Sequence, residues 1–147
     1  MLLTPKDPDW EARVRSSFAR QPFMATLGAR MTHLAPGAVD LEIELRDDLT
    51  QQHGYFHAGA TSSIADSAAG YAALSLFPAG SGVLTSEYKI NLLNPAKAPT
   101  LVARGRVIKP GRTLTIARGD VYGLEENGQV HVATGLFTLM CLEGLND

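Results

Sequence analysis

The segment from Ala58 to Phe77 constrains the fold more than any other part of this chain. Fourteen of its 20 residues are Gly, Ala, Ser or Thr, and only one residue, Asp66, is charged. Alanine favours helix, and small side chains let a helix pack closely on most of its sides. Because the segment is poor in Leu and Ile and carries a carboxylate midway, it is unlike a transmembrane span. It predicts a long buried helix that ends before Pro78.

The chain on either side of this helix is predicted to be mostly β-strand. The stretch from Val39 to Leu45 alternates apolar with acidic residues, as a strand with one exposed face does. A weaker strand from Leu27 to Leu34 precedes it. Beyond the helix, Asn127-Gly128 is a strong hairpin signal between the last two of four further strands. We expect these four strands, over residues 83–93, 100–109, 113–124 and 129–142, in meander order.

A short amphipathic helix is expected near the N-terminus. Trp10, Val14 and Phe18 recur at helical spacing, Asp9 is a candidate N-cap, and Pro22 ends the pattern. The predicted fold class is α+β: an antiparallel β-sheet wrapped around the long central helix, with this additional helix. The length fits a single domain over residues 1–147, in which residues 1–22 are a helical extension.

Composition and charge exclude several classes of protein. The net charge of -2 gives no basis for binding nucleic acid or an acidic membrane. One cysteine, Cys141, is too few for a disulfide framework or a cysteine-based zinc site. His53 and His57 are four residues apart but lack the glutamate of the zinc-protease motif, so no metal and no cofactor is predicted. The first ten residues include charged ones in place of an apolar leader, which is typical of a cytoplasmic protein.

Asp66 is the first candidate for chemistry. A carboxylate in a buried helix costs several kcal/mol unless it is paired or protonated. Its face of the helix carries only small residues, so another backbone can approach it closely. The alternative is a carboxylate that simply faces solvent, and we favour a functional site. The Asp66 face holds Gly59, Ser62, Ser63, Gly70 and Ala73, and the apolar face expected to meet the sheet holds Ile64, Ala68, Tyr71 and Leu74.

The start of the same helix is the second candidate. The unpaired N–H groups of Ala58 and Gly59 lie at the positive end of the helix dipole and can bind an oxyanion. His57 directly precedes them, and the amide of Gln51 can orient water or a carbonyl. His57 and Asp66 are nine residues apart, which puts them on opposite faces and about 13 Å apart. Two antiparallel copies can bring them together, so the spacing predicts a homodimer with composite sites.

Positive charge is concentrated in one part of the chain. Seven basic residues and no acidic residue lie between Tyr88 and Gly119. A phosphate-rich ligand is the natural partner of such a run, and the alternative is a solvated face balanced by acidic strands. No phosphate-binding glycine loop and no serine-hydrolase elbow is present. The basic residues are Lys89, Lys97, Arg104, Arg106, Lys109, Arg112 and Arg118.

Four motifs, in this order and spacing, resemble the hotdog-fold acyl-CoA thioesterases, and most closely the phenylacetate-pathway branch. They are QQHGYFHAGA from Gln51 to Ala60, then Asp66, then YKINLLNPAK from Tyr88 to Lys97, and KPGRT from Lys109 to Thr113. The resemblance covers about residues 27–142. It implies a sheet wrapped around a central helix and active sites that lie between subunits.

The resemblance also implies roles for individual residues. Asp66 matches the catalytic carboxylate, which acts as general base or as nucleophile. The Ala58 N–H matches the oxyanion donor, His57 the supporting histidine, and Gln51 the amide of the site. Thr85 falls where relatives carry a hydroxyl that helps to place the water or the carboxylate. The chain reads His-Ala-Gly from position 57 where many members read His-Gly-Gly; alanine can supply the same N–H if its φ is negative.

The resulting prediction is a hydrolase of aryl- or fatty-acyl-CoA thioesters. Its partner is the acyl-CoA substrate, with Gly59 near the thioester and Lys97, Lys109 and Arg112 on the phosphates of CoA. It is expected to be a homodimer, or a tetramer built from dimers. Two alternatives stay open: a hotdog-fold hydratase or dehydratase, in which His57 and a carboxylate move protons, and a non-catalytic acyl-CoA-binding protein.

Overall fold

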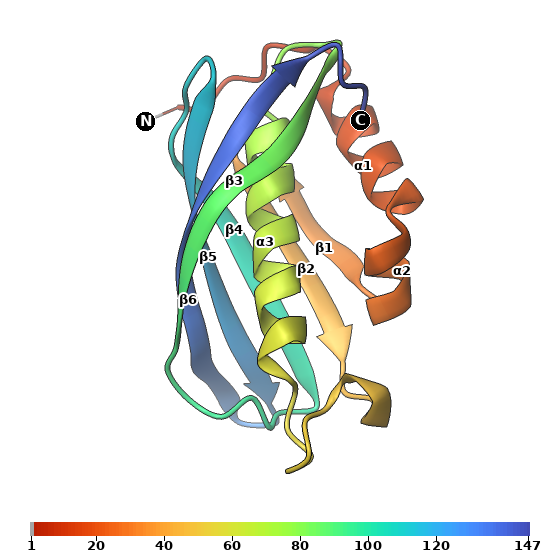
Figure 1. The fold of residues 1–147 in the computed structure, drawn as a ribbon, viewed down its shortest axis with the longest axis vertical. Coiled ribbons are helices and arrows are strands. Elements are labelled where there is room, and N and C mark those ends of the chain that lie inside the picture. Colours follow the sequence, from red (N-terminus) through yellow and green to blue (C-terminus); the bar gives the residue numbers. More distant parts are fainter. Residues whose placement is uncertain (1) are drawn as a thin grey trace.

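The computed structural model describes residues 2–147, which form a six-stranded antiparallel sheet curved around one long helix (Figure 1). The helix is α3 (Ala58–Leu74), and two shorter helices, α1 (Trp10–Arg20) and α2 (Pro22–Leu27), lie beside it. This is the predicted α+β hotdog architecture. The strands are β1 (Arg30–Ala35), β2 (Ala38–Glu44), β3 (Ser81–Leu92), β4 (Thr100–Lys109), β5 (Leu114–Glu125) and β6 (Gly128–Glu143), and a short 3-10 helix, η1 (Asp47–Leu49), follows β2.

The order of the strands corrects one expectation. The sheet runs β1-β2-β4-β5-β6-β3, so β4, β5 and β6 form the expected meander but β3 does not lie beside β4. Instead β3 pairs with β6, from Ser81 opposite Glu143 to Leu92 opposite Ala133. The connection over residues 93–99 then carries the chain to the other side of the sheet, where β4 pairs with β2. Because β3 and β4 lie on opposite sides of the β5–β6 pair, the curved sheet encloses α3 from both sides.

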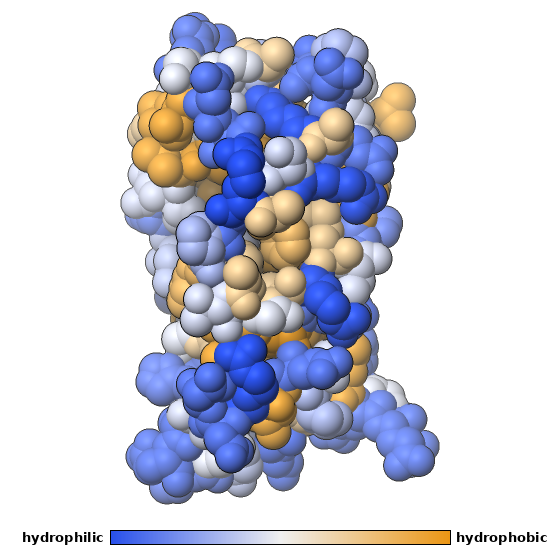
Figure 2. Space-filling view, turned by 90° about the vertical axis from the view of Figure 1, so that its right-hand side faces the viewer, coloured by the Kyte–Doolittle hydropathy of each residue, from blue (hydrophilic) through white to orange (hydrophobic). Residues whose placement is uncertain are grey.

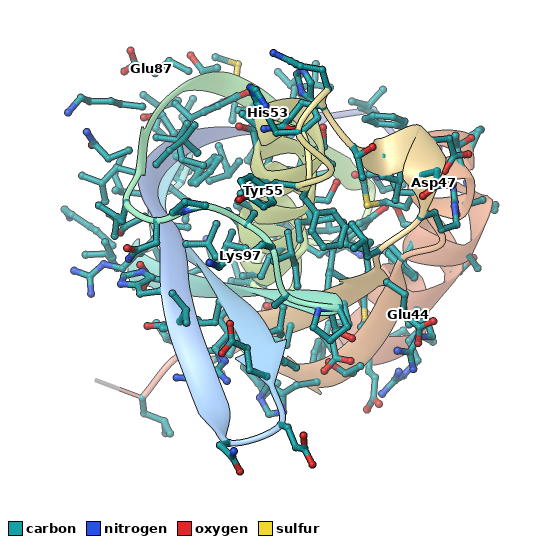
Figure 3. The ribbon with its side chains drawn as sticks, turned by 90° about the horizontal axis from the view of Figure 1, so that it is seen from below. Glu44, Asp47, His53, Tyr55, Glu87 and Lys97 are labelled. Atoms are coloured by element: carbon teal, nitrogen blue, oxygen red, sulfur yellow. The ribbon has the colours of Figure 1, made fainter. Side chains whose placement is uncertain are left out.

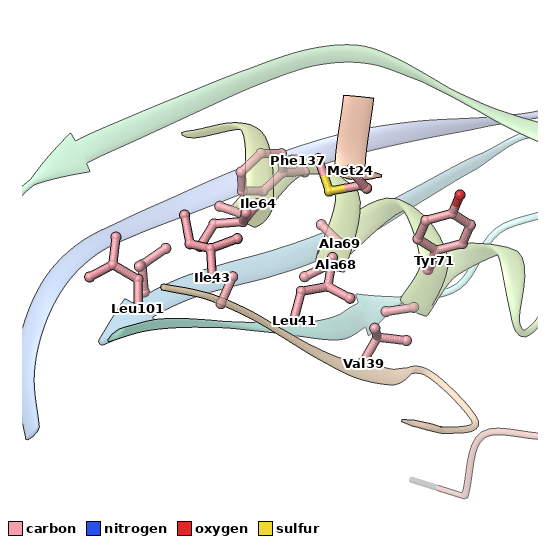
Figure 4. Close-up of a cluster of buried hydrophobic side chains, with 14 of the residues drawn as sticks. Met24, Val39, Leu41, Ile43, Ile64, Ala68, Ala69, Tyr71, Leu101 and Phe137 are labelled. Atoms are coloured by element: carbon pink, nitrogen blue, oxygen red, sulfur yellow. The ribbon is translucent and has the colours of Figure 1, made fainter. Parts of the chain in front are cut away.

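Helix α3 lies very close to the sheet because two glycines face it. A Cβ atom at Gly105 of β4 would collide with the backbone of Ala68, and one at Gly119 of β5 would press on Phe137 and Ala65. The small residues of α3 pack directly against these two glycines, and larger side chains fill the space around them. Figure 4 shows the resulting core, in which Ile64 and the alanines of α3 lie among strand residues such as Leu41 and Phe137.

The N-terminal extension is longer than predicted. Pro22 interrupts α1 but also begins α2, since proline is favoured in the first turn of a helix. Gly28, at φ 68°, ends α2, and the strand expected from Leu27 starts only at Arg30. The side chain of Asp9 makes no cap hydrogen bond; instead Asp7 Oδ1 accepts one from the Asp9 N–H at 2.9 Å.

Figure 2 shows the side of the molecule on which α1 and α2 lie, with apolar atoms in the middle and at the upper left and with hydrophilic atoms prominent above and below the middle. Among the helices formed by residues 2–147, none combines the length and the hydropathy needed to cross a membrane. The longest, α3, has 17 residues.

Candidate active site

Asp66 lies midway along α3 and is hydrogen-bonded by Thr85. The Thr85 hydroxyl donates to Asp66 Oδ1 at 2.6 Å, from a strand that a register shift distorts between Thr85 and Glu87. Such a bulge re-aims side chains at the edge of a sheet. Burial raises the pKa of the Asp66 carboxyl, and the hydrogen bond from Thr85 opposes that shift with a smaller effect. The structure thus brings together the carboxylate and the hydroxyl that the motifs pair.

A cavity of about 500 Å³ surrounds this carboxylate. It lies between the N-terminal helices, one face of α3 and the inner side of β3. Gly70 leaves room in it, because a Cβ atom there would meet nothing within 4 Å. Its lining residues include Ser17, Gln21 and Phe23 from the N-terminal helices, Ser63, Asp66, Ser67, Gly70 and Tyr71 from α3, and Val83, Leu84, Thr85 and Tyr88 from β3.

The start of α3 is organised by His57. Its ring Nδ1 accepts a hydrogen bond from the Gly59 N–H at 2.7 Å, so His57 caps the helix and the Gly59 donor is occupied. Within residues 2–147 the Ala58 N–H has no hydrogen-bond acceptor, which leaves it free for a ligand. No non-glycine residue described has a positive φ, so alanine at position 58 meets the condition for presenting this N–H.

Gln51 lies beside this helix start in a second cavity of about 490 Å³. Its Oε1 accepts from the His53 N–H at 2.6 Å, which fixes the side chain within its own loop. The amide nitrogen of Gln51 is then the end that can contact a ligand. The cavity is lined by Gln51, Tyr55, Phe56, His57, Ala58 and Thr61 together with Leu92, Leu93, Asn94, Pro95, Ala96 and Val132.

The two sets of predicted residues do not meet within one chain. Asp66 and Thr85 line the first cavity, and Gln51, His57 and Ala58 line the second. Ala58 and Asp66 are eight residues apart on α3, which is about 12 Å along the helix axis. The two groups of candidate residues therefore lie in different cavities of the chain.

The basic residues assigned to CoA are also divided. Lys97 lies at the end of the molecule that carries the 51–57 loop, where Tyr55 and Lys97 are neighbours in the view of Figure 3. Lys109 and Arg112 belong to the turn between β4 and β5, at the opposite end (Figure 1). Arg112 lines a small cavity there together with Lys6 and other residues of the N-terminal segment. One chain alone does not bring these three cations together.

Two other members of the basic run have structural partners. Arg106 pairs with Asp40 at 2.6 Å, and Arg104 donates to Gln129 and lies over the ring of Tyr122. For these two arginines a phosphate site is less suitable than the alternative, a solvated basic face whose side chains pair with residues on neighbouring strands.

Two side chains of α3 differ from the expected faces. Ala73, expected beside Asp66, is fully buried. Tyr71, expected to meet the sheet, is buried as well, but its hydroxyl lines the Asp66 cavity and bonds to Ser17 and Gln21. In Figure 4 this hydroxyl points away from Val39 and Leu41 of β2. In the sequence, the only sign of this role was that Tyr71 carries the one polar group on an otherwise apolar helix face.

Potential metal ligands are scattered. The structure of residues 2–147 contains no group of three or more His, Cys, Asp or Glu side chains placed to hold a metal ion. His57, one half of the histidine pair, uses Nδ1 to cap α3.

An antiparallel sheet wrapped around one long central helix is the hotdog fold. The profile of the family described as "Thioesterase superfamily" matches residues 53–128. The chain belongs to this family and is a thioester hydrolase, which confirms the resemblance stated above.

Solved structures agree with this assignment. A thioesterase family protein from Silicibacter pomeroyi is 50% identical, with a TM-score of 0.90 over 92% of this chain and 99% of that one. The E. coli PaaI protein from the phenylacetic acid degradation operon is 20% identical, with a TM-score of 0.82 over 92% and 95%. Thioesterase HI1161 from Haemophilus influenzae is 18% identical, with a TM-score of 0.78 over 88% of each chain. The last two likenesses establish the fold alone.

Proposed function

We propose that this protein hydrolyses acyl-CoA thioesters, with an aryl or aliphatic acyl group, at two composite sites of a homodimer. The observation that carries the proposal is the Asp66 carboxylate. It is half-buried, its pKa is raised by burial, and Thr85 holds it at the edge of a cavity. A structural carboxylate gains nothing from such a position, whereas a general base or nucleophile is activated by it.

The open edge of the sheet supports a dimer. Strand β3 pairs with β6 on one side only, and it is 12 residues long with large apolar side chains exposed on it. A long apolar edge is a template for pairing with another strand. An antiparallel pairing of two β3 strands about a two-fold axis continues the sheet and sets the two α3 helices against each other. The exposed apolar residues are Leu84, Tyr88, Leu92 and, just beyond the strand, Leu93.

This arrangement completes the chemistry that one chain lacks. The thioester carbonyl of the substrate accepts a hydrogen bond from the partner subunit's Ala58 N–H, which stabilises the oxyanion as it forms. Asp66 either removes a proton from the attacking water or attacks the carbonyl itself to form an acyl anhydride that water then hydrolyses; in both routes the CoA thiolate leaves and is protonated. Water supplies the oxygen of the free acid in both cases. The partner's Gln51 amide orients the water or the carbonyl.

The same two-fold relation accounts for the divided cations. It puts Lys97 of the partner subunit at the same end of the dimer as the Lys109 to Arg112 turn of this one. The 3′-phosphate and the diphosphate of CoA then have basic side chains from both chains within reach. These groups lie outside the cavity, so they add to binding more than to the chemical step.

The test is the hydrolysis of a panel of acyl-CoA thioesters, followed with a thiol reagent, for wild type and Asp66→Asn. We expect Asp66→Asn to fold and bind normally but to lose about 10²-fold or more in kcat. Asp48→Asn is the matched control, since Asp48 is an exposed carboxylate paired with Arg46, and it should keep full activity. Near-normal kcat in pure Asp66→Asn contradicts the role proposed for Asp66, whereas wild-type protein that binds acyl-CoA without hydrolysing it favours the acyl-CoA-binding protein. Hydration of enoyl-CoA in place of hydrolysis favours the hydratase alternative.

A further inference from the structure

The cavity around Asp66 continues beyond the carboxylate, and its far end is polar. Gly70 lies one helical turn further along α3, and the open space at its Cα shows that the cavity extends past it. Helix α1 contributes Ser17 to this end, and Gln21 lies between α1 and α2 and also lines it. The β3 side is apolar next to Thr85, where Leu84 lines the cavity. A ligand that lies along this cavity therefore passes an apolar wall and ends at polar groups.

Hydrogen bonds hold the polar groups at this end. The Tyr71 hydroxyl accepts from Gln21 Nε2 at 3.0 Å and from Ser17 Oγ at 3.2 Å. Gln21 Oε1 in turn accepts from the Ser67 hydroxyl at 3.2 Å. A phenol hydroxyl both donates and accepts, so the proton of Tyr71 is left for a further acceptor. Burial raises the pKa of Tyr71, so this hydroxyl is a donor at neutral pH.

The charges around the cavity favour an uncharged acceptor. Asp66 and Asp147 line it with carboxylates, and Arg20 is the one cation among its lining residues. Asp147 is held by the Val83 N–H, which donates to its Oδ2 at 2.9 Å. A negatively charged group on the ligand is repelled by the two carboxylates, whereas a hydroxyl or keto oxygen is not.

The geometry points to a specificity subsite for an uncharged oxygen on the acyl group, with Tyr71 as the donor and Gln21 and Ser17 as the groups that position it. The inference rests on the proposed function and adds that the acyl group of a thioester held beside Asp66 lies in this cavity. Tyr71 is five residues from Asp66, which is about 7.5 Å along α3. An extended six-carbon acyl group with a terminal oxygen has a comparable length, so we choose it as the test ligand. The preferred substrates are then medium-length acyl groups with a distal hydroxyl.

Three CoA thioesters of equal chain length test this subsite: hexanoyl, 6-hydroxyhexanoyl and adipoyl. For wild type we expect kcat/KM for the hydroxylated thioester to be about three- to tenfold above hexanoyl, the range of one neutral hydrogen bond, with adipoyl lowest. Tyr71→Phe keeps the ring but removes the donor, and should bring the first ratio to about one while hexanoyl changes less than about twofold. Tyr122→Phe is the matched control, since Tyr122 stacks on His131 and is absent from this cavity's lining. It should keep the wild-type ratio.

A second variant tests where the acyl group lies. Gly70→Ala adds a methyl group to open space on a helix, so it should fold at least as well as wild type. It should lower kcat/KM for all three six-carbon thioesters and leave acetyl-CoA unchanged, because a two-carbon acyl group does not reach Gly70.

The outcomes separate this inference from the proposed function. Hydrolysis of the thioesters with no preference for the hydroxyl overturns the subsite and leaves the proposed function intact. An equal loss on all three thioesters in Tyr71→Phe also overturns it, because Tyr71 then supports the fold or contacts the CoA arm. Failure to hydrolyse any thioester overturns the proposed function and this inference with it.

Discussion

At the scale of single residues, Asp66 could be recognised from the sequence and its surroundings could not. One charge in a helix of small residues is a local anomaly, and the structure gives it a half-buried position. The partner hydroxyl of Thr85 was identified only through the family motif, because the two residues are 19 positions apart. For Tyr71 the sequence showed only one polar hydroxyl on an apolar helix face, and this did not indicate that the hydroxyl lies in the same cavity.

The hydrogen bond from Thr85 makes a prediction about pH. In the proposed mechanism the Asp66 carboxylate is required for activity, so kcat/KM is expected to rise as pH passes the pKa of Asp66. The hydrogen bond stabilises the charged form and lowers that pKa. Thr85→Val removes it, so the acidic limb of the pH profile should move to higher pH. The measurement is kcat/KM from pH 4 to 9, with Thr134→Val, on another strand, as control; an unmoved limb would show that the titrating group is not Asp66.

At the scale of elements, local patterns predicted most of the helices and strands but not which strands pair with each other. The alternation in β2, the alanines of α3 and the Asn127-Gly128 turn each specify an element locally. The pairing of β3 with β6 depends on contacts more than 40 residues apart, which no local pattern contains. Helix α2 was missed because Pro22 both ends one helix and starts the next.

The N-terminal helix is anchored by Arg13, which carries a prediction about stability. Its guanidinium pairs with Asp7 at 3.0 Å and donates to four carbonyl oxygens at and beyond the end of α3. Both side chains are nearly buried, at 12% and 6% exposed. Arg13→Leu leaves Asp7 and the carbonyls without partners, so we expect a loss of about 3 kcal/mol or more in urea unfolding. Arg15→Leu is the control on the same helix, because its exposed pair with Glu11 should contribute less than about 1 kcal/mol. Equal losses would mean that Arg13 does not anchor the helix.

The turn between β4 and β5 carries a prediction about CoA recognition. Arg112 is exposed there, so its contact with a CoA phosphate is screened by solvent and salt. Arg112→Ala should raise KM for acyl-CoA several-fold with kcat nearly unchanged, because the contact is the same in the ground and transition states. The truncated acyl-pantetheine thioester lacks the nucleotide and is the control. A similar loss on both substrates would show that Arg112 supports the fold or the reacting groups.

At the scale of the whole molecule, the proposed dimer accounts for both the separation of the candidate residues into two cavities and the open edge of β3. Within residues 2–147 of a single chain, the Ala58 N–H at the start of α3 has no hydrogen-bond acceptor. Asp66 lies about 12 Å further along α3, so a thioester carbonyl held beside Asp66 is out of reach of that N–H. A single chain also leaves 12 residues of strand with one unpaired side. A two-fold pairing of β3 strands satisfies both, so the composite site and the dimer stand or fall together.

Mixed dimers test that link directly. Asp66→Asn removes the carboxylate, and Ala58→Pro removes only the N–H, because proline is well tolerated at the first position of a helix and His57 already has the extended backbone that precedes proline. Each homodimer should be inactive. Random exchange of subunits should restore about a quarter of wild-type activity, since half of the dimers then hold one intact site out of two. Melting curves of both variants check the fold, and differently tagged subunits verify exchange. If verified heterodimers stay inactive, the carboxylate and the N–H act within one chain and the sites are not shared.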